Sequence, residues 1–123
     1  IEDNELKTIK GNRHSIGYKK SNVDYEFKDH FINVKEGMKF YLSTDGYFDQ
    51  NGGEKSFPFG KRNFTNILIE NHHEQFVDQK EILLDTLQEY QGKEDKNDDI
   101  TVIGFSIKAN DDKILAKQNN REI

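Results

Sequence analysis

The sequence predicts an α+β fold in which a mainly antiparallel sheet packs against two consecutive helices. Two observations support this: short stretches alternate between apolar and polar residues, and two longer stretches carry apolar residues at helical spacing. Strands with one apolar face, followed by paired amphipathic helices, favour a layered arrangement of sheet and helices. A length of 123 residues is typical of one domain.

Four strands are expected. Residues 6–9 form a short apolar stretch, and residues 23–34 include alternating aromatic positions. Residues 38–42 alternate Met, Phe and Leu with Lys and Tyr, which predicts a half-buried strand. Residues 100–107 are rich in Ile, Val, Thr and Phe, which predicts a buried strand.

Two helices are expected between the third and fourth strands. Residues 61–71 and 76–90 both place apolar residues three and four positions apart. The last stretch, residues 109–123, is mostly polar, and the pattern leaves open a frayed tail or a short terminal helix.

Charge and composition exclude several classes of function. A net charge of −5 gives no basic surface for nucleic acid or for an anionic membrane. The chain has no cysteine, which excludes disulfides and thiolate chemistry and suits a cytoplasmic location. No apolar run approaches the length of a membrane span. The first residue is Ile1 and not an initiator Met, so we expect a piece of a longer protein.

Acidic residues lie at two predicted strand ends. Asp45 follows the strand at residues 38–42, and Asp98 and Asp99 precede the strand at residues 100–107. If these strands are antiparallel neighbours, the carboxylates meet at one edge and offer the hard oxygen ligands that Mg²⁺ and Mn²⁺ prefer. Asp-Gly is also a common turn pair, so spacing alone leaves both a metal site and a polar turn open.

Three ordered motifs point to a known family. They are YLSTDGYFDQ at residues 41–50, FGK at 59–61 and NDDITVI at 97–103, preceded by IKGNRHSIG at 9–17. Together they resemble the stage II sporulation protein E-like serine phosphatases of the protein phosphatase 2C group. The resemblance implies a partial protein phosphatase 2C-like α/β sandwich, with residues 1–108 as the C-terminal part of that domain and 109–123 as a polar tail.

The resemblance also implies a reaction and a metal site. The activity is hydrolysis of phosphoserine or phosphothreonine in bacterial signalling, by water activated between two Mn²⁺ or Mg²⁺ ions without a phosphoenzyme. Carried onto this chain, the metal ligands are Asp45 and Asp98, with Asp99 as a reserve ligand. Hydrophobic alternation does not decide whether Asp98 or Asp99 is the ligand, because apolar residues occupy both even and odd positions in the following strand. No catalytic residue is expected beyond the metal ligands.

One feature of the family is missing from the sequence. Complete members carry an upstream acidic residue and an Asp-Gly-His-Gly-like motif, whereas the only Asp-Gly pair here is at Asp45 and Gly46. Two ligands serve one metal ion only, so we expect the isolated chain to be inactive.

Three functions therefore remain open from the sequence: part of a metal-dependent phosphatase, a non-catalytic phosphatase-like interaction module, or an unrelated small α+β domain. For the first, the resemblance implies a phosphorylated protein partner, such as an anti-sigma-factor antagonist. A partial domain also leaves apolar surface exposed or covers it in a homodimer.

Overall fold

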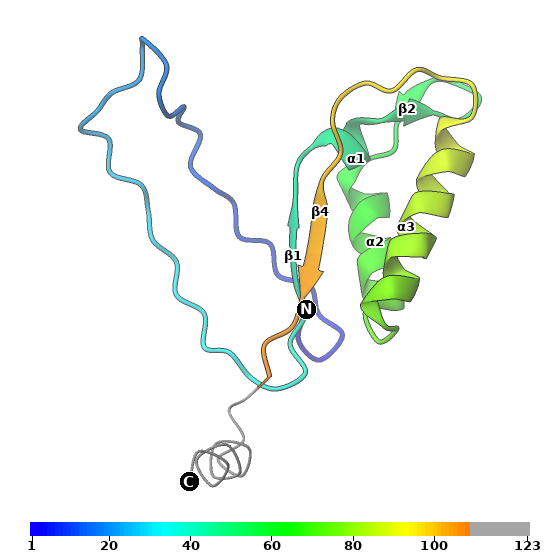
Figure 1. Ribbon diagram of the computed structural model, residues 1–123, viewed down its shortest axis with the longest axis horizontal. Helices are drawn as coiled ribbons and strands as arrows, with labels where there is room; N and C mark the ends of the chain where they lie inside the picture. Colours follow the sequence, from blue (N-terminus) through cyan, green and yellow to red (C-terminus); the bar gives the residue numbers. More distant parts are fainter. Residues whose placement is uncertain (109–123) are drawn as a thin grey trace, which may run out of the picture.

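The computed structural model describes residues 1–108 and confirms the α+β class. Strands β1 (Phe40–Ser43) and β4 (Val102–Phe105) form one antiparallel sheet, which lies beside helices α2 (Lys61–Asn71) and α3 (Phe76–Gln91) (Figure 1). A single turn, α1 (Gly46–Asp49), and a small hairpin of β2 (Asn51–Gly52) and β3 (Phe57–Pro58) connect β1 to α2.

Both long helices have nearly the bounds that the apolar spacing predicts. Helix α2 begins after Gly60, whose φ of 93° lies in the left-handed region that glycine adopts readily. Helix α3 ends at Gly92, which also has positive φ and donates its N–H to the carbonyl of Gln88 at 3.1 Å. Such glycine ends satisfy a carbonyl that the helix itself leaves without a partner.

The core lies between α1, α2 and α3. Tyr47 of α1 is only 2% exposed and packs against Phe59 and Phe64, with ring centroids 5.6 and 4.9 Å apart. Its hydroxyl donates to the carbonyl of Leu83 in α3 at 2.6 Å. Tyr47 therefore joins the three helices through both apolar packing and a hydrogen bond. The other buried apolar residues of this cluster are Leu68 and Leu87.

One face of the sheet of β1 and β4 packs on α3. Tyr41 donates its hydroxyl to Gln79 at 2.6 Å, and its cross-strand partner Gly104 lies under the ring of Phe76. A Cβ on Gly104 would come within 3.1 Å of that ring, so glycine allows the helix to approach the sheet closely.

The opposite face of this sheet is apolar and open. Alternation and register place Phe40, Leu42, Ile103 and Phe105 on it, and the two phenylalanine rings stack with centroids 5.3 Å apart. Leu42 is 60% and Ile103 is 51% exposed. The prediction that β4 is a buried strand is therefore wrong, because only its α3-facing side is covered. Exposed apolar surface, which the sequence also led us to expect, is present.

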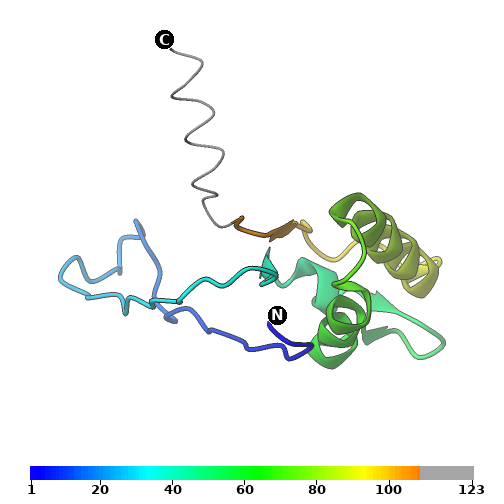
Figure 2. The same ribbon diagram turned by 90° about the horizontal axis from the view of Figure 1, so that it is seen from below.

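The two predicted N-terminal strands are also wrong. Neither 6–9 nor 23–34 forms a strand, and residues 7–38 run away from the helices as a long loop (Figures 1 and 2). Alternation indicates a half-buried face, but a strand also needs a neighbour for its N–H and C=O groups. Within residues 1–108 no segment pairs with either stretch. The expectation for residues 109–123 lies outside the described residues.

A search of the described helices finds none that is long and apolar enough to cross a membrane.

We predict that Tyr47 makes stability depend on alkaline pH. Burial raises the pKa of Tyr47 to about 12 from 10.0. The unfolded chain therefore loses this proton first, so stability is intact below pH 10 and falls as the pH rises from about 10 to about 12. Tyr47→Phe should lower the free energy of unfolding by about 1 kcal/mol at pH 7, because the hydrogen bond to Leu83 is lost. The variant has no phenol group to titrate at this position, so its stability should fall less between about pH 10 and about pH 12. Urea unfolding from pH 7 to 11.5 measures both effects, and parallel pH profiles for the two proteins would contradict the prediction.

Candidate functional site

The paired ends of β1 and β4 bring the two predicted acidic clusters to one edge. Ser43 is opposite Val102, and one step further the N–H of Thr44 donates to the carbonyl of Thr101 at 3.0 Å. The N–H of Thr101 in turn donates to the hydroxyl of Thr44 at 3.1 Å. Asp45 follows this contact on one strand, and the Asp98–Asp99 pair precedes it on the other. The two strands are therefore antiparallel neighbours, which is the arrangement that the predicted metal site requires.

Gly46 allows the two segments to touch. A Cβ at this buried position would lie 2.1 Å from the carbonyl oxygen of Asp99 and 2.9 Å from its carbonyl carbon. Real Cβ atoms do not approach backbone so closely, so the contact requires glycine. Gly46 is thus a packing requirement at this edge, independent of any role of Asp45.

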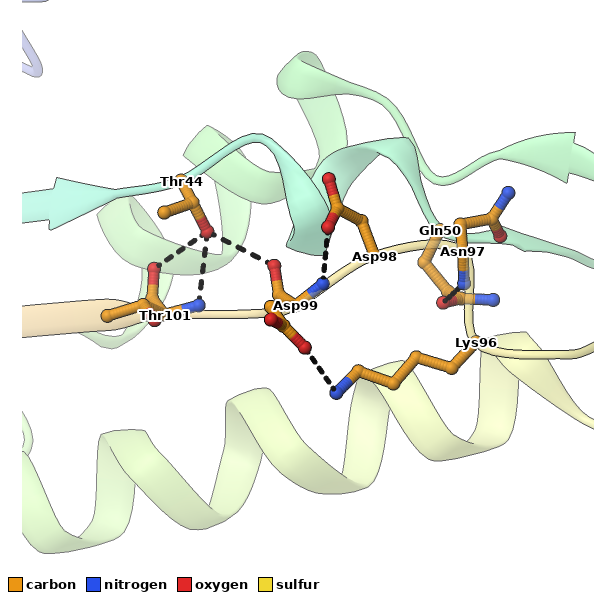
Figure 3. Close-up of polar contacts among 7 residues, drawn as sticks. All are labelled: Thr44, Gln50, Lys96, Asn97, Asp98, Asp99 and Thr101. Carbon is orange, nitrogen blue, oxygen red and sulfur yellow. Dashed lines mark hydrogen bonds and ion pairs between the residues drawn. The ribbon is translucent and has the colours of Figure 1, made fainter. Parts of the chain in front are cut away.

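The three carboxylates have different surroundings. Asp45 begins α1 without a side-chain capping bond, and Asp98 accepts the N–H of Asp99 at 2.7 Å. Asp99 pairs with Lys96 at 3.6 Å, and its carboxylate points to the opposite side of the loop from that of Asp98 (Figure 3). Among the described residues, neither Asp45 nor Asp98 forms an ion pair.

The second motif, at residues 59–61, binds to the same segment. The N–H of Phe59 donates to the carbonyl of Gln50 at 2.9 Å, and the N–H of Gly60 donates to that of Phe48 at 2.8 Å. All three sequence motifs therefore meet around residues 44–50. The motif order along the chain gave no indication of these contacts, which are made by the backbone.

Sequence reasoning missed the most buried polar residue of this region. Gln50 is fully buried, and its side chain bonds to the loop that carries Asp98. Gln50 ends the first motif, but a glutamine after a turn is ordinarily exposed, so the sequence gave no signal of its burial.

Asp45 and Asp98 are the right type of ligand for a hard divalent cation, but they are too few to complete its coordination shell. Asp45 and Asp98 are exposed oxygen donors of the type that Mg²⁺ and Mn²⁺ select. Within residues 1–108, however, no group of three or more His, Cys, Asp or Glu side chains is arranged to hold a metal ion. The described part of the chain therefore offers a partial coordination shell.

Comparison with protein families matches residues 3–108 to the family described as Stage II sporulation protein E (SpoIIE). The chain belongs to the SpoIIE family. Among solved structures, the SiaA-PP2C domain of Pseudomonas aeruginosa is similar, with 38% sequence identity and a TM-score of 0.64. The match covers 69% of this chain and 35% of that chain. A comparison with curated proteins gives no match.

These findings confirm the family resemblance read from the motifs and the partial protein phosphatase 2C-like fold. The chain matches about a third of the length of the SiaA-PP2C domain, so it spans part of such a domain. The family match excludes the third hypothesis from the sequence, that the chain is an unrelated small α+β domain.

We predict that Gly46→Ala disturbs this edge of the SpoIIE-family chain. The added methyl group must displace the backbone of Asp99, so we expect a loss of about 1–3 kcal/mol in the free energy of unfolding. Gly11→Ala is the matched control, because its Cβ would meet nothing within 4 Å, and it should change stability by less than about 0.5 kcal/mol. Urea unfolding of both variants tests this. Equal stabilities would show that the Asp99 backbone yields without cost.

Proposed function

We propose that this chain is part of a metal-dependent protein serine/threonine phosphatase, in which Asp45 and Asp98 bind Mn²⁺ or Mg²⁺. The observation that supports the proposal is that the paired ends of β1 and β4 carry two exposed acidic residues at the same edge of the sheet, in a chain of the SpoIIE family. Asp98 is preferred to Asp99 because the Asp99 carboxylate turns to the other side of the loop, toward Lys96.

The chain's own contribution to the reaction is to supply and hold ligands. Divalent cations, when bound, provide a water of lowered pKa and neutralise charge on the phosphoryl group. Asp45 and Asp98 offer negative oxygen donors at the surface, where a phosphorylated protein has access. A cation held by both side chains is attracted to each of the two negative charges. The proposed substrate is a phosphoserine or phosphothreonine protein, with a phosphorylated anti-sigma-factor antagonist as one candidate.

A non-catalytic interaction module is the second candidate. It is favoured by one observation: the described residues contain no group of three metal-binding side chains. In this role the chain binds a signalling partner and at most one cation. The two candidates differ in whether these carboxylates support turnover when a complete set of ligands is available.

We predict that the 123-residue chain binds Mn²⁺ weakly, because two protein ligands leave most of the coordination shell to water. Asp45→Asn and Asp98→Asn should each remove most of this affinity, since each replaces a charged oxygen by a neutral amide. Asp99→Asn is the control of equal charge change and should keep more affinity than either. Titration of free Mn²⁺ by electron paramagnetic resonance gives the dissociation constants. Equal losses in all three variants would indicate a diffuse charge effect and not a site.

We predict turnover from a chimera in which this chain replaces the matching third of the SiaA-PP2C domain. The chimera should hydrolyse a phosphoserine peptide in a Mn²⁺-dependent reaction, whereas the chain alone should give no hydrolysis. Asp45→Asn in the chimera should reduce turnover to near background, and Asp99→Asn should retain it. A folded, Mn²⁺-binding chimera without activity would favour the non-catalytic module. Circular dichroism and thermal melting establish whether each chimera is folded.

A further inference from the structure

Gln50 stands out because its amide is fully buried and both its nitrogen and its oxygen form hydrogen bonds. The Nε2 group donates to the carbonyl of Asn51 at 3.0 Å and to that of Asp95 at 2.8 Å. The Oε1 atom accepts the N–H of Asn97 at 3.2 Å. The Asn97 side chain returns the contact, since its Oδ1 accepts the N–H of Asn51 at 3.0 Å (Figure 3 shows Gln50 and Asn97 together). Residues 50–51 and 95–97 are thus tied by reciprocal bonds.

Apart from these bonds, the loop is held near its two ends: Glu94 bonds to Gln91 and Ser56, and the carbonyl of Asp99 lies against Gly46 and accepts the hydroxyl of Thr44. Residues 93–99 read KEDKNDD and contain no apolar side chain, so hydrophobic packing does not position them. Its ion pair, between Lys96 and Asp99, is exposed at 3.6 Å and contributes little. Compared with this exposed ion pair, the hydrogen bonds of the buried Gln50 amide restrict the position of the loop backbone much more closely.

Asp98 lies between two anchors. On its N-terminal side, Asn97 is bonded to Gln50. On its C-terminal side, the carbonyl of Asp99 lies against Gly46, and the N–H of Thr101 bonds to Thr44. Both anchors belong to the segment that also carries Asp45, so they fix one acidic residue relative to the other.

We propose that Gln50 is a positioning residue that holds the Asp98 loop against the Asp45 segment and so sets the geometry of the cation site. This inference rests on the proposed function for the role of the carboxylates, and on the Gln50 contacts for the rest. Gln50 acts through the backbone of residues 95–97 and is not itself a ligand.

The chain supplies a matched control in Gln79. This second buried glutamine is 4% exposed, donates to the carbonyls of His72 and Glu74, and accepts the hydroxyl of Tyr41. It has the same chemistry as Gln50 but joins α3 to β1 and to the end of α2, with no contact to the Asp98 loop. Any effect of losing a buried amide in general appears in both positions.

The experiment compares Gln50→Met and Gln79→Met in the full 123-residue chain, since methionine keeps the length but has no amide. Amide hydrogen exchange of residues 95–99 and the dissociation constant for Mn²⁺ are measured, with thermal melting as the stability control. Both variants should lower the melting temperature. Only Gln50→Met should speed exchange in the loop and weaken Mn²⁺ binding, by about tenfold or more, as for other groups that orient metal ligands.

Unchanged loop exchange in Gln50→Met would overturn the inference, and so would Mn²⁺ affinity equal to that of Gln79→Met. If the unsubstituted chain binds no Mn²⁺, the proposed function fails, and the exchange data alone then decide whether Gln50 holds the loop. If Gln50→Met does not fold, Asn97→Ala replaces it, because Asn97 is exposed and bonds the same segment. That variant should show the same changes to a smaller extent, and exchange and affinity as in the unsubstituted chain would overturn the inference.

Discussion

The antiparallel pairing of β1 with β4 is the contact on which the rest of the structure depends. It joins residues such as Thr44 and Thr101, which are 57 positions apart, and closing so long a segment carries an entropic cost. The helices between them offset that cost by burying Phe64, Leu68 and Leu87 against Tyr47. The acidic edge therefore exists only when the helical layer is packed, so ligand geometry and core stability are linked.

The sequence predicted those elements of the fold whose pattern lies in residues close together along the chain. The spacing of apolar residues in α2 and α3 reflects one helix face, and it gave both helices within about one residue of their ends. The alternation at β1 and the Asp-Gly that follows it located the acidic edge. Local signal also sufficed for the family, because the residues of each motif are close together in the chain even though the motifs meet only in the fold.

What the sequence did not predict depends on neighbours. Residues 6–9 and 23–34 have strand-like alternation, yet no described segment pairs with either of them as a neighbouring strand. The short α1, β2 and β3 follow from backbone contacts at Phe48, Gln50 and Gly60 that leave no periodic pattern. The choice between Asp98 and Asp99 depends on how the loop backbone turns, and hydrophobic alternation carries no information about that.

The open face of the β1–β4 sheet bears on how copies of this chain behave in solution. Apolar side chains cover it, and among the described residues neither outer edge of the sheet has a strand neighbour. Such a surface is a template for sheet growth by identical chains. The net charge of −5 opposes this by mutual repulsion, but the repulsion vanishes near the isoelectric point of about 5.4. Mild acid and high concentration are therefore the conditions under which colloidal stability is lowest.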